Sequence, residues 1–334
     1  MATESYQFVP ISQKIFEKLS TGIIFILYTQ APFSGWLFFI YLFTTRFWWL
    51  ALAYLVWLYY DKDTPDLGGR TIPWIQNNKI WYYPKSYFPS KLALAPGFNL
   101  DPKRNYLFCF FPHGIIPNAV YIGLTSGVSD FQHLYPQFQV QLVILRILLF
   151  TPFWREVIMG MGLTSSTAKS LNYILSRPEG GRIVVLSPGG AMEAYYGRPQ
   201  KYTFLIKERK GFIKMALRHG SPLVPVIAFG EPDLFEQVIS EKLRPIQEFI
   251  RKYVGIAPVI FYGTGFLFRY GLVPRKVPLT CALGKPIEVE KVESPTNEEI
   301  DSLHAKFVQE LKDLFDLHKD KFLEKPDDDS LVIM

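Results

Sequence analysis

The sequence has few of the patterns that mark secreted, metal-binding or nucleic-acid-binding proteins. Only two cysteines occur in 334 residues, Cys109 and Cys281, and their wide separation argues against a disulfide framework or a cysteine-based metal cluster. No Asn-x-Ser/Thr sequon is present, in keeping with little luminal exposure. Helix-turn-helix, RNP and Cys/His finger patterns are also missing, so we expect no bound metal and no nucleic-acid partner.

Apolar residues are abundant instead. Hydrophobic residues make up 49% of the chain and aromatic residues 16%, including 28 Phe and 19 Tyr. This content is high for a soluble enzyme and indicates membrane lipid as a partner. The net charge of +6 fits an anionic membrane surface or a phosphate-bearing ligand.

The longest apolar segment covers residues 21–60, in which Arg46 is the only charged residue. A segment of this length could cross a bilayer twice, at about 20 residues per helical crossing. The run after the break, Phe47–Tyr60, is short for a crossing, so a re-entrant hairpin is an equal alternative. A cleaved signal peptide and a buried hairpin of a soluble protein are the weaker alternatives, the first because no cleavage site follows.

Basic residues flank this segment on both sides, with Lys14 and Lys18 before it and Lys62 and Arg70 after it. The positive-inside tendency therefore predicts that both ends face the cytosol. We divide the chain into a cytosolic amphipathic N-terminus (1–20), a membrane hairpin (21–60), an interfacial linker rich in Pro, Gly and aromatic residues (61–104), a catalytic α/β domain (105–323) and a polar, disordered tail (324–334).

Strands and helices alternate after residue 105. Short apolar runs predict buried strands at Tyr106–Phe111, Arg182–Ser187, Leu223–Phe229 and Val277–Leu283. Apolar spacing and end signals predict helices at Ser165–Ser176, Glu208–His219 and Asn297–His318. Val140–Phe150 predicts a further helix, either in the core or in the membrane interface. The alternation indicates a mixed-sheet α/β sandwich behind the membrane hairpin.

The segment Phe111-Pro112-His113-Gly114 follows the first predicted strand. Proline fixes the chain and glycine removes a side chain beside the imidazole, which can present a histidine to a ligand at the strand end. Because its pKa lies near neutrality, His113 could accept a proton from an alcohol. A turn histidine that bonds only the backbone is an equal alternative.

A second candidate segment follows the strand at Arg182–Ser187. Gly189 and Gly190 would let a substrate approach the backbone, and Glu193 could orient an imidazole. Taken alone, the two glycines also fit a plain turn.

A third candidate segment opens a predicted helix. Arg209, Lys210 and Lys214 lie at its start, where basic side chains and the helix dipole favour a phosphate group. A solvated basic face is an equal alternative at this point.

Together, these segments resemble the type-2 diacylglycerol acyltransferase family, which also contains monoacylglycerol acyltransferases and wax-ester synthases. The resemblance covers roughly residues 55–320, and its most specific segment is Arg209–Glu231. Further matching positions are Asp61, Thr64-Pro65, Gly68-Gly69-Arg70, Tyr87-Phe88-Pro89, Arg155-Glu156, and Gly263 with Gly265-Phe266.

The resemblance implies an α/β sandwich of the glycerolipid-acyltransferase type and an acyl-CoA-dependent O-acyltransferase that converts diacylglycerol to triacylglycerol. Monoacylglycerol or a long-chain alcohol is the alternative acceptor. It also implies the endoplasmic reticulum membrane, a cytosolic catalytic domain and contact with lipid droplets. Acyl-CoA is a co-substrate, so no bound cofactor is implied, and a homo-oligomer stays open.

The resemblance assigns His113 as the general base, and we pair it with Glu193, with Gly114 beside the developing oxyanion. The family pattern is His-Pro-His-Gly, so Phe111 in the first position puts a helper role in doubt. Asn118 stands where the distantly similar glycerophosphate acyltransferases have an aspartate, which favours Glu193 as the partner. We assign substrate contacts to Pro112, Phe111, Asn118, Gly189, Gly190, Arg209, Lys210, Lys214 and Glu231, the three basic residues serving the phosphates of CoA.

Two rival interpretations remain at this stage. A Cys109 acyl-enzyme is a rival mechanism, although a buried cysteine is the commoner role for such a position. A catalytically inactive lipid-binding membrane protein is the alternative from a different class; Phe111 favours it, whereas the intact His113 and Glu193 oppose it.

Overall fold

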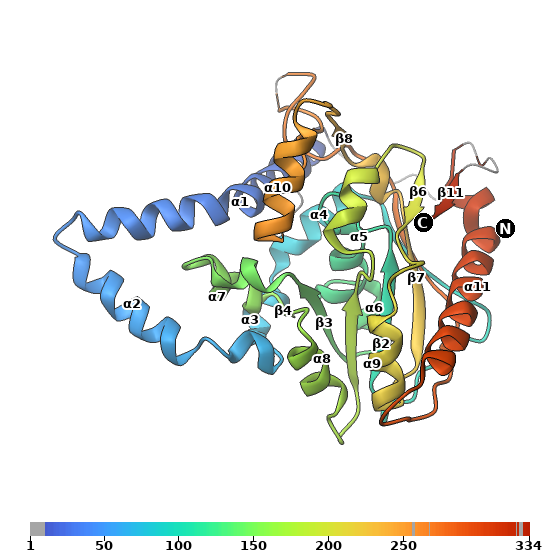
Figure 1. Ribbon diagram of the computed structural model, residues 1–334. Helices are drawn as coiled ribbons and strands as arrows, with labels where there is room; N and C mark the ends of the chain where they lie inside the picture. The colour runs from blue at the N-terminus through green and yellow to red at the C-terminus, as the bar shows by residue number, and fades with distance from the viewer. Residues whose placement is uncertain (1–10, 256–257, 267, 325, 327–329) are drawn as a thin grey trace.

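The computed structural model describes residues 11–255, 258–266, 268–324, 326 and 330–334. Its centre is a seven-stranded sheet in the order β1-β10-β7-β2-β5-β3-β4, with helices on both faces (Figure 1). Neighbouring strands are parallel except for β10 and β7, which are antiparallel. The expected mixed-sheet α/β fold is therefore confirmed.

The strands of this sheet are β1 (Ser90–Leu94), β2 (Tyr106–Phe111), β3 (Gln139–Ile144), β4 (Leu163–Ser165), β5 (Arg182–Leu186), β7 (Leu223–Phe229) and β10 (Leu279–Leu283). Two small sheets pair β6 (Tyr202–Phe204) with β11 (Leu331–Ile333), and β8 (Glu236–Gln237) with β9 (Phe261–Tyr262). The helices are α1 (Ile11–Phe43), α2 (Trp48–Tyr60), α3 (Pro73–Gln76), α4 (Tyr82–Tyr87), α5 (Asn118–Val120), α6 (Asp130–Leu134), α7 (Trp154–Gly160), α8 (Ala168–Leu175), α9 (Gly211–His219), α10 (Arg244–Val254) and α11 (Asn297–Phe322).

The central strand β2 is buried on both faces, as expected for a strand between parallel neighbours. Its alternating side chains enter two separate cores. Phe108 and Phe110 join a core that also contains Phe25 of α1. Cys109 and Phe111 join the opposite core, which α8, α9 and α11 cover. Strand alternation therefore decides which residues near the end of β2 lie on the side of the N-terminal helix.

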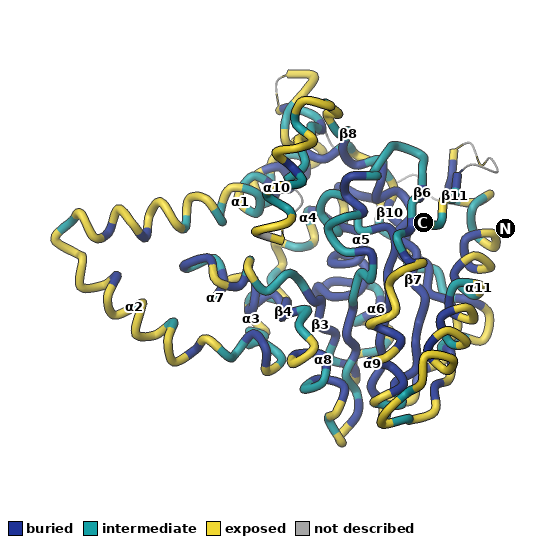
Figure 2. Tube along the Cα trace, viewed as in Figure 1, coloured by how far each residue is buried: buried dark blue, intermediate teal, exposed yellow. Residues whose placement is uncertain are grey.

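The N-terminal hairpin projects from the globular domain as two arms (Figure 1). Helix α1 runs without interruption through Pro32, and the break between the arms is the turn around Arg46. Both arms are largely exposed (Figure 2), and Gln13–Phe43 is long and apolar enough to cross a membrane by length and composition. The expected separate segment 1–20 is not seen, because residues 11–20 already belong to α1; residues 1–10 lie outside the described chain.

Three expectations about the globular part are wrong. The linker 61–104 contributes β1 to the sheet, because Ser90–Leu94 pairs with β10 along its whole length. The helix expected at Val140–Phe150 is instead strand β3 followed by a 3-10 turn, since β3 is held between β4 and β5. The tail expected to be disordered over 324–334 ends in β11, which pairs with β6 in parallel.

Candidate active site

His113 lies just beyond the end of β2, on the face of the sheet that α1 covers. Its ring stacks on Phe110, with 6.3 Å between centroids and 27° between planes. Phe110 belongs to the same core as Phe25 of α1. Taken as a whole, the residue His113 is half-buried.

The hydrogen bonding of His113 defines its tautomer. Nδ1 lies 3.0 Å from the carbonyl oxygen of Gly114, and a carbonyl can only accept, so Nδ1 carries the proton and donates. Nε2 is then left with a free lone pair. Burial lowers the pKa of His113, although the bond to Gly114 opposes that effect, so the ring is neutral at pH 7. A neutral imidazole with a free Nε2 is the form that can accept a proton.

Glu193 holds the main chain of His113 rather than its ring. It lies in the 3-10 turn η5 (Gly190–Tyr196) and is only 2% exposed. Its carboxylate accepts from the backbone N–H of His113 at 2.6 Å and from that of Leu205 at 2.9 Å. The prediction that Glu193 orients the imidazole is therefore wrong: the Gly114 carbonyl does so, and Glu193 fixes the loop on which the ring is mounted.

Burial dominates the electrostatics of this carboxylate. It raises the pKa of Glu193 to about 8, against the opposing effect of the bonds from His113 and Leu205 and of the nearby charge of Arg209.

The two glycines before this turn have different roles. A Cβ on Gly189 would lie 2.0 Å from Oε1 of Glu193, whereas one on Gly190 would meet nothing within 4 Å. Gly189 therefore leaves room for the Glu193 carboxylate rather than for a substrate. Gly190, with φ +60°, opens onto free space and remains compatible with a substrate contact.

Glu231 secures the other end of the His113 loop. It follows β7, is 3% exposed, and accepts from the backbone N–H groups of Asn118 at 3.2 Å and Ala119 at 2.7 Å. Oε1 also lies 3.3 Å from the side-chain amide of Asn118, and burial raises the pKa of Glu231 to about 8. Asn118 and Glu231 were predicted to contact substrate. In the structure they instead hydrogen-bond to each other at the start of α5.

Gly114 lies between these two carboxylates. Its φ of +64° belongs to the left-handed region, and a Cβ there would approach Cγ of Glu231 to 2.7 Å. A side chain at this position would push apart the loop that carries His113.

Phe111 and Cys109 face away from the imidazole. Phe111 is fully buried and its ring lies 5.2 Å from that of Phe204, so the predicted substrate contact is wrong. Its difference from the family histidine therefore alters the opposite core, not the surroundings of His113. Cys109 is also fully buried, and burial raises the pKa of its thiol well above the usual range, which disfavours a thiolate nucleophile.

The three basic residues that were predicted to bind the phosphates of CoA have different surroundings in the structure. Lys210 pairs with Asp301 of α11 at 2.6 Å. Arg209 and Lys214 are exposed, and of the three only Arg209 influences the pKa of Glu193. Of these three residues, Arg209 is therefore the one whose charge reaches the turn that holds the His113 backbone.

A small cavity of about 10 Å³ lies beside the same loop and has room for about one water molecule. Its lining residues are Pro112, Gly114, Glu193, Gly197, Lys201, Thr203 and Pro232.

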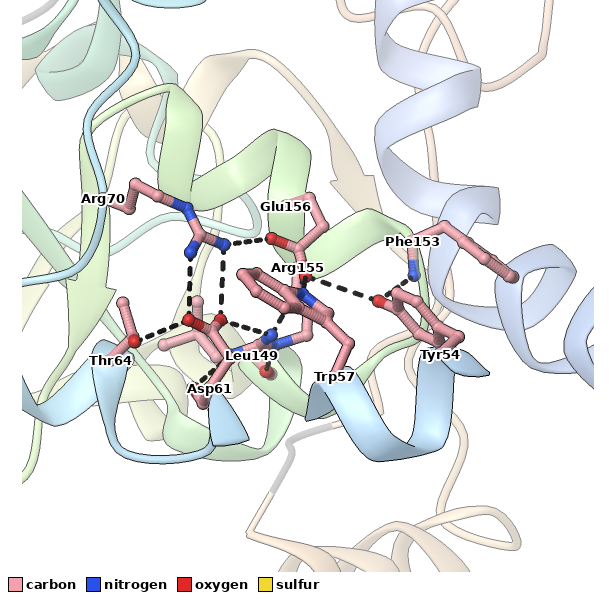
Figure 3. A network of polar contacts seen from close by, with 9 residues as sticks. All are labelled: Tyr54, Trp57, Asp61, Thr64, Arg70, Leu149, Phe153, Arg155 and Glu156. Carbon is pink, nitrogen blue, oxygen red and sulfur yellow. Dashed lines mark hydrogen bonds and ion pairs between the residues drawn. The ribbon is translucent and has the colours of Figure 1, made fainter. Parts of the chain in front are cut away.

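Sequence reasoning missed the ion-pair cluster that fixes the hairpin to the domain (Figure 3). The guanidinium of Arg155, 1% exposed, donates to the Asp61 carboxylate at 2.8 Å and to the Leu149 carbonyl at 2.9 Å. Arg70 bonds both Asp61 and Glu156. Burial opposes ionisation of Asp61, but bonds from Thr64, Arg70 and Arg155 lower its pKa overall. Asp61, Arg70 and Arg155-Glu156 are among the positions that match the family pattern, but the match did not indicate what these residues do.

Two aromatic side chains of α2 complete this cluster. Trp57 donates to Glu156 at 3.2 Å, and the hydroxyl of Tyr54 accepts from the backbone N–H of Phe153 at 2.8 Å. The returning arm of the hairpin is therefore bound to α7 and its preceding loop.

Comparison with known proteins shows which family the chain is similar to. The family model described as diacylglycerol acyltransferase matches residues 40–334. The chain is 37% identical to 2-acylglycerol O-acyltransferase 1 of Bos taurus over 98% of both chains. It is 38% identical to diacylglycerol O-acyltransferase 2 of Danio rerio, over 84% of this chain and 79% of that protein.

Among solved structures, the crystal structure of the 1-acyl-sn-glycerophosphate acyltransferase PlsC from Thermotoga maritima aligns over 90% of this chain and 98% of that one. Its sequence identity is 13% and its TM-score is 0.41, too low to support an argument. The family model and the relatives suffice: this chain belongs to the diacylglycerol acyltransferase family and is an acyltransferase.

Proposed function

We propose that the protein transfers an acyl group from acyl-CoA to the free hydroxyl of diacylglycerol, forming triacylglycerol, with His113 as the general base. The observation that carries this proposal is the imidazole whose Nδ1 is bonded to the Gly114 carbonyl and whose Nε2 has no hydrogen-bond partner among the described residues. Nε2 takes the hydroxyl proton as that oxygen attacks the thioester carbonyl. When the carbon–sulfur bond breaks, the imidazolium returns the proton to the leaving CoA thiolate. General-base assistance of this kind contributes about 10²–10⁴-fold in rate.

The surrounding residues act by placing this ring. Glu193 and Glu231 each hold backbone N–H groups on either side of it. The backbone N–H of Gly114 is our candidate oxyanion donor, a contribution of about 10²–10³-fold. Arg209 is our candidate contact for a CoA phosphate, because it is exposed and close enough to affect Glu193.

We propose that the hairpin enters and leaves one leaflet from the cytosolic side of the endoplasmic reticulum membrane or a lipid droplet. Helix α2 has 13 residues, which span about 20 Å, less than the bilayer's hydrocarbon core of about 30 Å. The first half of α1 contacts the globular domain through Phe25, and the residue that follows α2, Asp61, contacts it as well. Both arms join the same domain, which either path allows, but α2 is too short for a full crossing, so a re-entrant path fits better than two crossings.

Monoacylglycerol is the second candidate acceptor, and one observation favours it. The Bos taurus relative that matches over 98% of both chains is named a 2-acylglycerol O-acyltransferase. The chemistry at His113 would be the same, since either acceptor offers a glycerol hydroxyl.

The test uses washed membranes, radiolabelled oleoyl-CoA and a panel of diacylglycerol, monoacylglycerol and long-chain alcohol. The wild type should form labelled triacylglycerol, and His113→Ala at equal expression should lose at least about 10²-fold in rate. Labelled diacylglycerol from monoacylglycerol alone would establish the second candidate. No product from any acceptor, or near-normal turnover by His113→Ala, would overturn the proposal.

A further inference from the structure

Helix α10 exposes an apolar stripe that nothing in the described chain covers. Ile246, Phe249 and Tyr253 are 59%, 62% and 67% exposed and follow one another at helical spacing. Gln247 lies on the buried side, where its amide donates to the Pro258 carbonyl at 2.9 Å. A soluble surface rarely shows large apolar side chains in such a row.

Neighbouring loops extend this stripe. We call the whole surface the α10 ridge, and besides the stripe it contains the exposed residues Val238, Ile239, Ile260, Phe266, Phe268, Tyr270 and Leu272. Exposed basic side chains accompany it, among them Lys242, Arg244, Lys252 and Arg269. Apolar and aromatic side chains bordered by cations match the interface of an anionic leaflet.

The α10 ridge is continuous with the membrane hairpin. Both α10 and α1 show exposed surface (Figure 2), and residues of the loops around α10 pack against α1. The Phe266 ring packs so closely against Gly22 of α1 that a Cβ there would lie 2.4 Å from it. Phe235 contacts Phe25 with 5.8 Å between centroids. A leaflet that receives the hairpin therefore meets the ridge next.

The same helix also braces the turn that carries Glu193. The Tyr195 hydroxyl donates to the backbone carbonyl of Gln247 at 3.2 Å. The guanidinium of Arg244 lies 5.2 Å from the centre of the Tyr195 ring. Tyr195 is two residues from Glu193, which holds the His113 backbone.

From these contacts we infer that the α10 ridge is a second membrane-contact surface, with α10 lying in the headgroup region of an anionic leaflet. This contact would hold the Glu193 turn, and with it the His113 loop, at the lipid boundary. The inference concerns where the domain sits and does not depend on which acceptor is esterified.

The test places an environment-sensitive fluorophore on the full-length protein in vesicles of phosphatidylcholine and phosphatidylserine that carry a quencher on their lipid chains. Phe249→Cys supplies the labelling site, because the native Cys109 and Cys281 are buried and resist labelling. Lys306→Cys, on the exposed side of α11, is the matched control. Tyr253→Cys gives a second site on the stripe, so that failure of one variant to fold leaves the test intact.

We expect several-fold stronger quenching at residues 249 and 253 than at residue 306. Quenching equal to that of the control would overturn the inference. So would shielding of residue 249 that depends on protein concentration and not on lipid, because a second copy of the chain would then cover the ridge.

Discussion

Replacing Gly189 by alanine should disable the enzyme without touching any group that contacts substrate. The new Cβ would lie 2.0 Å from Oε1, 2.3 Å from Cδ and 2.6 Å from Cγ of Glu193. The backbone of Gly189 is ordinary, with φ −67° and ψ −28°, so alanine brings no conformational strain of its own. The methyl group and the carboxylate cannot both stay, and Glu193 must leave the position from which it bonds His113 and Leu205.

The size of the effect follows from these two bonds. Because burial raises the pKa of Glu193 to about 8, the group is mostly neutral at pH 7. A hydrogen bond to a neutral group contributes about 0.5–1.5 kcal/mol, so losing both costs about 1–3 kcal/mol of loop order. A displacement of the His113 ring by about 1 Å would lower turnover about 10²-fold. We therefore expect Gly189→Ala to lose about 10²-fold in kcat while remaining folded.

Gly190→Ala is the matched control, one residue away in the same turn. Its φ of +60° makes alanine cost about 1–2 kcal/mol in backbone strain, but its Cβ would meet nothing within 4 Å. Turnover of both variants is measured with labelled acyl-CoA at matched amounts of folded protein. Equal turnover in the two variants would refute the role assigned to Glu193.

Three further predictions follow from the same contacts. Cys109→Ala should retain full turnover in the labelled acyl-CoA assay, because the thiol is buried on the opposite face from the imidazole; loss of turnover with the fold intact would revive the acyl-enzyme. Arg155→Met should destabilise the detergent-solubilised protein by about 3–5 kcal/mol, because it leaves Asp61 buried beside fewer cations. Adding Asp61→Asn should recover part of that loss, as measured by thermal unfolding. Purely additive losses would contradict the pairing of Arg155 with Asp61. Burial raises the pKa of Glu231 from 4.5 to about 8, so its contribution to stability is complete below pH 4.5 and is lost as the pH rises through 8. The thermal midpoint of the wild type should therefore fall relative to that of Glu231→Gln between pH 5 and pH 8. The opposite trend would contradict the assignment.

The sequence was most informative where local pattern and tertiary environment agree. The expected strands at Tyr106–Phe111 and Leu223–Phe229 have the bounds of β2 and β7, because continuous apolar runs suit strands buried on both faces. Val140–Phe150 was misassigned because apolar runs of this length fit a helix or a strand, and only pairing with β4 and β5 decides between them.

The candidate site shows a different limit. Reasoning from the residues paired Glu193 with the ring of His113, whereas the carboxylate bonds the backbone N–H of that residue. A backbone donor has no residue type, so no sequence pattern distinguishes the two. The same limit hid the role of Glu231, whose partners are the backbone groups of Asn118 and Ala119.

The pH dependence of kcat/KM tests the central claim most directly. If the neutral His113 ring takes the proton, activity should fall on the acid side with an apparent pKa below the usual 6.5, because burial lowers the pKa of this imidazole. The residual activity of His113→Gln should lack that acid limb. An acid limb above 6.5, or one that persists unchanged in His113→Gln, would show that another group accepts the proton.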